Sequence, residues 1–330
     1  MKLTETIFTI TTSEEFERIA LETFQHQYKN VKVFREFCDL LKVIPSEVTT
    51  IEDIPFLPIQ FFKSHRVLAE GLSSKTVFTS SGTTGNTTSK HYISDLNLYK
   101  KSFSEAFKTH FGNIEDYCVL ALLPSYLERE GSSLVYMVDD LIKQSNNPQS
   151  GFYLDNTQEL IERLEYLETV IPAEAGNKTI LLGVSYALLD LIETRKFQLK
   201  NTIIMETGGM KGRRKEMIKE ELHQILKEGF GVSNIYSEYG MTELLSQAYS
   251  KGNGIFTCPP WMKILTRDTE DALSLIKNKT GGINVIDLAN INSCSFIATQ
   301  DLGKVYSDNS FEIIGRFDQS DIRGCNLMIL

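Results

Sequence analysis

TILLGVSYALLDLIETRKFQLKNTIIME, residues 179–206, is the stretch that decides the fold class. It begins and ends with a short apolar run (179–184 and 202–206), and the segment between them is long enough for a helix. Such runs are typical of strands buried on both faces, and a helix that joins two of them makes a parallel strand–helix–strand unit. Similar runs lie at 117–123, 151–154 and 234–239. This alternation predicts an α/β fold in which helices flank and cover a parallel sheet.

Two segments on either side of this stretch have helical periodicity. RRKEMIKEELHQILKE (213–228) predicts a helix that ends at Gly229, because glycine is favoured just after the last helical residue. Aromatic residues recur every four positions from Tyr99 to Phe111. This spacing predicts a helix that begins near Asp95 and has one aromatic face.

The two ends of the chain have different patterns. A helical pattern runs from Ser13 to about Lys42, and Thr12 with Glu15 has the spacing of a capping box at its start. After about residue 250 the pattern changes to short strands, with turn signals at Gly281-Gly282 and at 307–309. We therefore expect an α/β region over 1–250 and a small β-rich subdomain over 251–330.

The composition excludes several classes of protein. The chain has 330 residues, with 34 basic and 43 acidic side chains and a net charge of −9, whereas a nucleic-acid partner requires a basic surface. The five cysteines contain no C-x-x-C pair and the five histidines no HExxH spacing, which indicates neither a disulfide framework nor a zinc site. No apolar stretch has the length of a membrane span or the form of a secretory signal. We expect a cytoplasmic protein without membrane insertion.

Hydroxyl side chains and glycines gather in FTSSGTTGNTTSKH, residues 78–91. Glycines allow backbone N–H groups to converge on an anion, and serine and threonine hydroxyls add further donors. The stretch lacks the Gly-Lys-Ser/Thr ending of a P-loop. The pattern suits a phosphate-binding loop, although such a cluster alone is also typical of an ordinary surface loop.

Further motifs follow the predicted strands. TGGMKG (207–212) comes directly after one strand, and YSEYGMTE (236–243) contains the end of another. Ligands of open parallel sheets bind at the carboxyl ends of the strands, where Glu243 suits a magnesium ion that holds phosphate oxygens. ATQD (298–301) supplies a carboxylate suited to ribose hydroxyls, and GRFDQSDIRGCN (315–326) is a charged turn. Each of these motifs alone also fits a plain turn or helix cap.

Together, and in this order, the motifs resemble those of the adenylate-forming superfamily of acyl-CoA synthetases, peptide-synthetase adenylation domains and luciferases. SSGTTG resembles its phosphate loop, TGGMKG its adenine-side glycine loop, YGMTE its magnesium and phosphate motif, TQD its ribose carboxylate, and GRFDQSDIRG its GRxDDxIxxRG hinge. Within the superfamily, IPFLPIQFFKSH (54–65), LPSYLEREGSSLVYM (123–137) and METGGMKG (205–212) resemble the LuxE-type acyl-protein synthetases of bacterial bioluminescence. Phenylacetate-CoA ligases are the next relatives, and the resemblance covers nearly the whole chain.

The resemblance implies an AMP-forming acyl ligase with ATP and Mg²⁺ as cofactors. It would convert a carboxylic acid, most simply a fatty acid, to acyl-AMP, release pyrophosphate and transfer the acyl group to a thiol. Residues 1–250 would be the nucleotide- and acyl-binding region. The thiol would belong to the chain itself, an acyl-reductase or acyl-carrier partner, or coenzyme A.

The family's site residues transfer to matching positions of this chain. Ser81, Thr83 and Thr84 would hold the β- and γ-phosphates. Thr242 would contact the α-phosphate and Glu243 would bind Mg²⁺. The full implied set for the nucleotide is Ser80, Ser81, Gly82, Thr83, Thr84, Gly85, Lys90, Gly208, Gly209, Tyr239, Gly240, Asp301 and Arg316.

The chain departs from the superfamily pattern in two ways. Asn86 stands where many members have a lysine, and Lys90 is the nearest substitute. The sequence ends at Leu330, so we expect the C-terminal mobile domain and its catalytic lysine to be missing. In acyl-protein synthetases of this short form, a cysteine near the carboxyl terminus accepts the acyl group, and Cys325 matches it. Neighbouring Arg323 would favour the thiolate, whereas a buried, inert cysteine is the alternative.

A serine hydrolase is a rival hypothesis, because Gly183 to Ala187 resembles a nucleophile elbow around Ser185. His223 is the only histidine that follows, and Asp190 is the only aspartate between them. These positions disfavour a Ser-His-Asp triad, and Ser185 is instead predicted to be a helix N-cap.

A non-catalytic ATP- or acyl-binding protein is the other alternative. The missing lysine favours this hypothesis, whereas the hydroxyls of the phosphate loop, Glu243 and Asp301 oppose it.

Overall fold

The computed structural model describes residues 3–80, 87–123, 131–153, 156–170, 178–209 and 217–317. The chain divides into two compact units, of which one comprises residues 1–72 with 260–330 and the other comprises residues 73–259. Residues 1–72 therefore group with the C-terminal strands. The predicted division into residues 1–250 and 251–330 does not group the N-terminal residues with the C-terminal strands, and it stays a prediction.

The unit of residues 73–259 contains a sheet in the order β5-β4-β6-β7-β8-β9-β10. Its strands are β4 (Tyr117–Leu122), β5 (Gly151–Phe152), β6 (Lys178–Gly183), β7 (Thr202–Glu206), β8 (Tyr236–Tyr239), β9 (Ala248–Ser250) and β10 (Ile255–Thr257). The pairs from β5 to β8 are parallel, and β9 and β10 are added antiparallel. All six residues of β4 are buried, as expected for a strand covered on both faces. The predicted α/β fold is confirmed.

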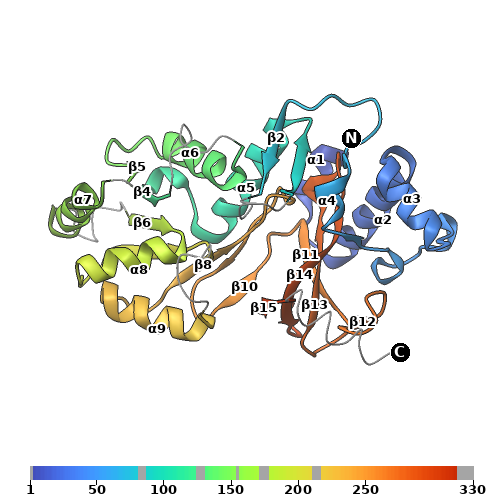
Figure 1. The fold of residues 1–330 in the computed structure, drawn as a ribbon. Coiled ribbons are helices and arrows are strands. Elements are labelled where there is room, and N and C mark those ends of the chain that lie inside the picture. The colour runs from blue at the N-terminus through green and yellow to red at the C-terminus, as the bar shows by residue number, and fades with distance from the viewer. Residues whose placement is uncertain are drawn as a thin grey trace. The chain divides into compact units, whose positions relative to one another are not determined.

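Helices lie on both faces of this sheet (Figure 1), with α5 and α6 on one face and α8 and α9 on the other. The helices of this unit are α5 (Leu96–Phe111), α6 (Ser133–Ser145), α7 (Thr157–Val170), α8 (Ser185–Thr194) and α9 (Lys219–Phe230). The predicted start of α5 is confirmed, because the Asp95 side chain accepts a hydrogen bond from the Asn97 N–H and caps the helix. Its aromatic face is buried at Tyr99, Phe103 and Phe107.

The end of α9 differs from the prediction. The helix continues to Phe230, and Gly231 is the left-handed residue that follows it, with φ 68°. Gly229 lies inside the helix, where a Cβ would come within 2.5 Å of Ile192 Cδ1 of α8. This glycine therefore permits close packing of α9 on α8 instead of ending the helix.

The unit of residues 1–72 and 260–330 contains antiparallel strands in the order β12-β11-β13-β14-β15, and β1 pairs in parallel with β14. Its strands are β1 (Leu57–Pro58), β11 (Met262–Arg267), β12 (Leu275–Ile276), β13 (Gly281–Asp287), β14 (Phe296–Val305) and β15 (Phe311–Arg316). Its helices are α1 (Leu3–Thr6), α2 (Ser13–Asn30), α3 (Lys32–Leu40) and α4 (Phe61–Ser64).

The N-terminal helices pack on these strands through aromatic and polar contacts. The predicted capping box is present, since Thr12 and Glu15 each bond the other's backbone N–H. The helical pattern predicted from Ser13 to about Lys42 is confirmed over most of its length, but extended backbone at Val31 divides it into α2 and α3. The Gln27 amide donates to the Asn290 carbonyl at 2.9 Å and ties α2 to the segment before β14. Buried bonds of this kind fix a helix in one position on a sheet.

The turn predicted at Gly281-Gly282 is also wrong, since both residues begin β13. A Cβ on Gly282 would come within 2.6 Å of Cζ in the Arg267 guanidinium. That buried guanidinium donates to the Ile283 carbonyl and to Asn284 Oδ1 at 2.7 and 2.8 Å. The glycine thus makes room for a buried arginine. The second predicted turn is confirmed between β14 and β15, where Asn309 has φ 64°.

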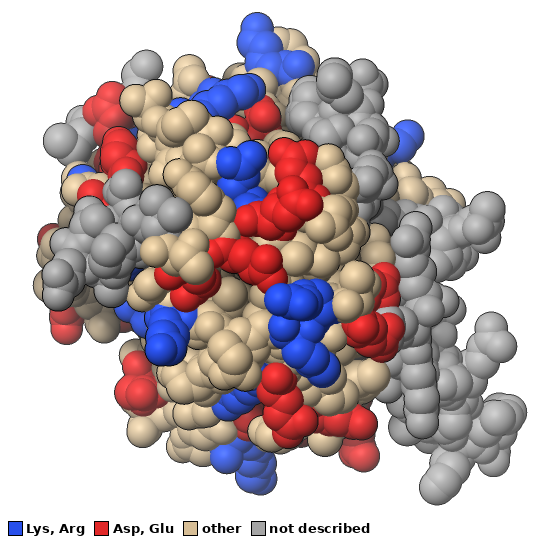
Figure 2. Space-filling view, turned by 90° about the vertical axis from the view of Figure 1, so that its left-hand side faces the viewer, with Lys and Arg blue, Asp and Glu red and all other residues tan. Residues whose placement is uncertain are grey.

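Figure 2 shows one face of the molecule, on which basic and acidic side chains are interspersed without a large patch of one sign. Such a face lacks the basic stripe that phosphate backbones require. Among the helices that the structure describes, none combines the length and apolar character needed to cross a membrane.

Candidate functional site

Two of the predicted motifs lie at the same edge of the parallel sheet. The loop Thr207–Gly209 follows β7, and Gly240 follows β8. The two strands are parallel neighbours, with Glu206 opposite Ser237. Because the carboxyl ends of parallel strands face the same edge, the structure brings the glycine loop and the YGMTE motif to one end of the unit.

The loop Thr207–Gly209, which we call the glycine loop, has a conformation that requires glycine. Gly208 and Gly209 have φ values of 72° and 89°, which residues with a Cβ rarely adopt. The Gly208 carbonyl accepts from the Ser185 N–H at 3.2 Å, and the Thr207 N–H donates to the Gly183 carbonyl at 3.0 Å. A Cβ on Gly208 would meet no described atom within 4 Å. No described residue therefore covers this face of Gly208, while the loop's backbone is bonded to the segment that joins β6 and α8.

Glu206, the last residue of β7, is a buried carboxylate that the sequence analysis did not single out. It is 1% exposed. It accepts from Gly208 N at 2.6 Å, from Lys219 Nζ at 2.8 Å and from Ser185 Oγ at 3.2 Å, and His223 Nε2 lies at 3.4 Å. Burial raises the pKa of this carboxyl group, but the Lys219 charge and the hydrogen bonds outweigh burial and hold the pKa well below its usual range.

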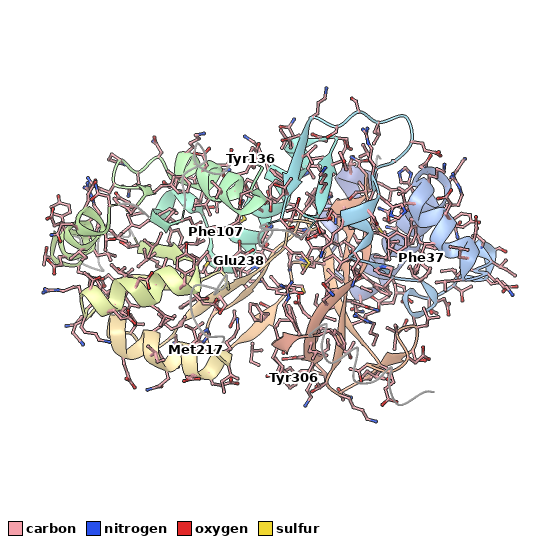
Figure 3. The ribbon with its side chains drawn as sticks, viewed as in Figure 1. Phe37, Phe107, Tyr136, Met217, Glu238 and Tyr306 are labelled. Atoms are coloured by element: carbon pink, nitrogen blue, oxygen red, sulfur yellow. The ribbon has the colours of Figure 1, made fainter. Side chains whose placement is uncertain are left out.

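Glu238, on the neighbouring strand β8, has the opposite character. Figure 3 shows it among the strands of its unit. Burial, followed by the negative charge of Glu206, raises its pKa to about 8, so the group is neutral at pH 7. A Cβ at position 240 would clash with a carboxyl oxygen of Glu238. At Gly240 of the YGMTE motif, a larger residue would therefore need the Glu238 carboxyl group to move.

The Ser/Thr/Gly-rich loop joins β2 (Thr76–Thr79) to β3 (Lys90–Ile93), which pair antiparallel. Its base is closed by two bonds, from Ser80 N to the Ser89 carbonyl at 3.1 Å and from Ser89 N to Ser80 Oγ at 3.0 Å. Lys90 is exposed at the start of β3. The predicted residues Ser81, Gly82, Thr83, Thr84 and Gly85 lie outside the described residues.

His91 joins this hairpin to the YGMTE motif. Its Nδ1–H donates to the Thr242 carbonyl at 2.9 Å. The ring is 1% exposed, and burial lowers its pKa to about 4, which keeps it neutral. Sequence reasoning missed this residue because a lone histidine carries no motif. The bond brings together two segments that are 151 residues apart in the chain.

Tyr239 and Glu243 belong to the same YGMTE motif as Thr242, and both are largely buried. Tyr239 packs edge-on against Phe256, with ring centroids 5.9 Å apart, and Glu243 is 5% exposed. In the part of the chain that the structure describes, no group of three or more His, Cys, Asp or Glu side chains is arranged to hold a metal ion. A metal bound there would need ligands from its substrate.

Asp301 and Arg316 belong to the other unit and form an ion pair across β14 and β15. Arg316 Nε donates to Asp301 Oδ1 at 2.9 Å, and the two residues are register partners. The arginine side chain is 73% exposed, whereas the aspartate is buried. Their roles toward a nucleotide stay predictions.

Cys325, the predicted acyl acceptor, lies outside the described residues. The described cysteines are Cys38, Cys118, Cys258 and Cys294. Burial raises the pKa of the Cys118 thiol to about 11 and that of Cys38 to about 12. These two thiols are therefore poor nucleophiles at neutral pH.

The serine and histidine of the hydrolase hypothesis both contact Glu206, but the three side chains are not arranged as in a catalytic triad. Ser185 Oγ donates to Glu206, and His223 contacts the other oxygen of the same carboxylate. In a hydrolytic triad the histidine lies between the serine and the acid, whereas here the acid lies between them. The predicted N-cap role of Ser185 is wrong, since Val184 is the N-cap and Ser185 is the first helical residue.

Comparison with known proteins gives a family and a fold. Residues 11–330 match the family described as "Acyl-protein synthetase, LuxE". A "Long-chain-fatty-acid–luciferin-component ligase" from Photorhabdus luminescens is 37% identical over 70 residues, which are 21% of this chain and 60% of that protein. The chain thus matches less than two thirds of the length of this curated relative.

Solved structures of adenylate-forming ligases share the fold. A 2-hydroxyisobutyryl-CoA ligase in complex with 2-HIB-AMP and CoA matches with a TM-score of 0.65 and 13% identity, over 94% of this chain and 77% of that one. ATP-bound MatB from Rhodopseudomonas palustris matches with a TM-score of 0.52 and 17% identity, over 73% of this chain and 47% of that one. At these identities the similarity shows the fold alone.

Proposed function

The chain belongs to the acyl-protein synthetase (LuxE) family, and from this premise we propose that it activates a carboxylic acid with ATP. The acid carboxylate attacks the α-phosphorus of ATP, the bond to the β-phosphate oxygen breaks, and acyl-AMP and pyrophosphate form. A thiol then attacks the acyl carbonyl, AMP leaves and a thioester remains.

The observation that supports this proposal most strongly is the bond from His91 to the Thr242 carbonyl. It joins the strand after the Ser/Thr/Gly-rich loop to the YGMTE motif, at the sheet edge that carries the glycine loop. Thr83, Thr84 and Ser81 would bind the β- and γ-phosphates in this arrangement. Catalysis would then consist of alignment and of neutralising charge on the phosphates.

Glu243 fits the role of magnesium ligand. It is a largely buried carboxylate, and proteins typically bind Mg²⁺ through one or two carboxylates together with substrate phosphates. A bound Mg²⁺ would neutralise phosphate charge, while Thr242 contacts the α-phosphate. The proposed nucleotide site also includes Gly208, Gly209, Tyr239 and Gly240.

Asp301 is the proposed ribose ligand. Its carboxylate has one oxygen bonded to Arg316, and this bond orients the carboxylate. An ionised carboxylate accepts hydrogen bonds from both hydroxyls of a ribose. Lys90, exposed at the base of the Ser/Thr/Gly-rich loop, is the proposed substitute for the missing lysine of that loop.

A fatty acid is the proposed substrate, as the name of the Photorhabdus relative indicates for that protein. Cys325 is the proposed first acceptor, because it matches the acceptor cysteine of the family, whereas burial keeps the Cys38 and Cys118 thiols protonated. Transfer onward would require an acceptor thiol on an acyl-reductase or acyl-carrier partner, or coenzyme A.

Carboxylate-dependent ATP–pyrophosphate exchange tests the first half-reaction. Exchange with one class of acid is expected, and Glu243→Ala should lower its rate at least about hundredfold by removing charge stabilisation. Glu165→Ala, which removes an exposed carboxylate paired with Arg195, is the control and should leave the rate unchanged. ATP binding without exchange for any acid would favour a binding protein instead.

Mass spectrometry of the intact chain after incubation with ATP and the active acid tests the acceptor. The wild-type chain should gain the mass of one acyl group, which hydroxylamine removes, and Cys325→Ser should not gain it. Cys258→Ser removes a partly exposed cysteine and should still be acylated. Equal acylation of Cys325→Ser would exclude this cysteine as the acceptor.

A further inference from the structure

Strand β7 has a buried or partly buried carboxylate at each of its ends. At the amino end, Glu168 of α7 accepts from the backbone N–H groups of Lys200 and Asn201, at 2.9 and 3.1 Å, and from Thr202 Oγ1 at 2.8 Å. At the carboxyl end, Glu206 accepts from Gly208 N and Ser185 Oγ. The two carboxylates make similar bonds, but only Glu206 contacts the glycine loop.

The two oxygens of Glu206 have separate partners. Oε2 accepts from the Gly208 N–H in the glycine loop and from Ser185 Oγ at the start of α8. Oε1 accepts from Lys219 Nζ at the start of α9 and lies 3.4 Å from His223 Nε2 one turn later. One side chain therefore ties the loop to two helices on the same face of the sheet.

The glycine loop needs such a tie to have one conformation. Two consecutive glycines with positive φ lose much conformational entropy when they are ordered. The Gly208 N–H bond to an ionised oxygen is charge-assisted, and such bonds are about twice as strong as neutral ones. The adjacent Lys219 ammonium and the His223 ring stabilise the buried charge.

We propose that Glu206 is a positioning residue that holds the glycine loop in the conformation that binds the nucleotide. The inference rests on the proposed function for the identity of the ligand. Glu206 acts through the Gly208 amide and the Ser185 hydroxyl, and the face of Gly208 that no described residue covers is the surface that meets the ligand.

Glu206→Gln and Glu168→Gln form a matched pair for the test, because both neutralise a carboxylate at an end of β7. Hydrogen–deuterium exchange is measured first, on overlapping peptides that cover both ends of the strand. In Glu206→Gln we expect exchange at residues 207–209 to become at least about tenfold faster, since the amide loses its ionised acceptor. In Glu168→Gln the faster exchange should appear at residues 200–202 instead.

ATP–pyrophosphate exchange kinetics give the second readout. Glu206→Gln should raise the KM for ATP about ten- to hundredfold, with less than about a threefold change in the KM for the acid, because only the nucleotide side of the site is displaced. Glu168→Gln should leave both values near those of the wild type. Ser185→Ala, which removes one bond to the same oxygen, should shift the KM for ATP in the same direction by less, and it serves if Glu206→Gln does not fold.

The outcomes separate this inference from the proposed function. Unchanged exchange at 207–209 in Glu206→Gln, or an equal rise in the KM for ATP in both variants, would overturn the positioning role. A wild-type chain with no pyrophosphate exchange for any acid would overturn the proposed function. In that case the deuterium measurement on the two variants still decides whether Glu206 holds the loop.

Discussion

Glu206 and Glu238 lie on neighbouring parallel strands, and burial affects both in the same way. Glu206 is 1% exposed and Glu238 is 9% exposed. Burial is the largest influence on each pKa and raises it in both cases. Nevertheless the pKa of Glu206 lies well below its usual range, and that of Glu238 is raised to about 8. The difference comes from what surrounds each carboxyl group.

Glu206 has a lysine, a histidine, a serine and a backbone amide within bonding distance. Glu238 instead faces the negative charge of Glu206, which adds to the effect of burial. A buried carboxyl group ionises only where enough donors and positive charges replace its water. Of these two carboxyl groups, Glu206 on β7 therefore holds a fixed negative charge, whereas Glu238 on β8 keeps its proton.

The largest expected effect on stability comes from removing Lys219, the cation that pairs with Glu206. Lys219→Met leaves the buried Glu206 carboxylate without its charged partner at 2.8 Å. We expect the free energy of unfolding at pH 7 to fall by about 3 kcal/mol, because breaking a buried ion pair leaves an uncompensated charge. Urea denaturation measures the loss.

Lys100→Met is the control for Lys219→Met. Lys100 pairs with Asp140 at 2.7 Å, but its side chain is 43% exposed, so its loss should cost less than about 1 kcal/mol. Equal destabilisation by the two variants would show that the buried Glu206 pair contributes no more to stability than the exposed Lys100 pair.

A second effect, which depends on pH, is expected from Glu238→Gln. The folded pKa of Glu238, about 8, lies above the ordinary value of 4.5, so between these values the unfolded chain releases a proton that the folded chain keeps. Wild-type stability should therefore fall as pH rises from 5 to 8, with Glu238 contributing up to about 1.4 kcal/mol per pH unit. Glu238→Gln has no such proton, and its stability should decline less over the same range.

Urea denaturation at several pH values between 5 and 8 tests this expectation. Glu206 does not interfere in that range, because its lowered pKa makes its contribution disappear only as pH falls below about 4.5. Parallel curves for the wild type and Glu238→Gln would mean that Glu238 is already ionised in the folded protein.

Much of the fold followed from local sequence signals. The apolar runs predicted β4, β6 and β7 within a residue or two, and Asp95 and Thr12 predicted the starts of their helices. These signals depend on neighbours in the chain. The helix end predicted at Gly229 and the turn predicted at Gly281-Gly282 were wrong, because contacts with other elements determine these positions. Gly229 packs against Ile192 and Gly282 against Arg267. A glycine has the same appearance in the sequence whether it ends an element or makes room for a side chain.

The residues of the candidate site likewise fall into those that the sequence indicated and those that only the structure brought together. The sequence by itself determined the family, the α/β class and the motifs around Gly208, Gly240 and Asp301, because these depend on residue type, order and spacing. Only the tertiary structure brought His91 to Thr242 and placed Glu206 between the glycine loop and α9. The physical reason is that a buried polar side chain is defined by its partners, and these partners come from strands and helices that are distant in the chain.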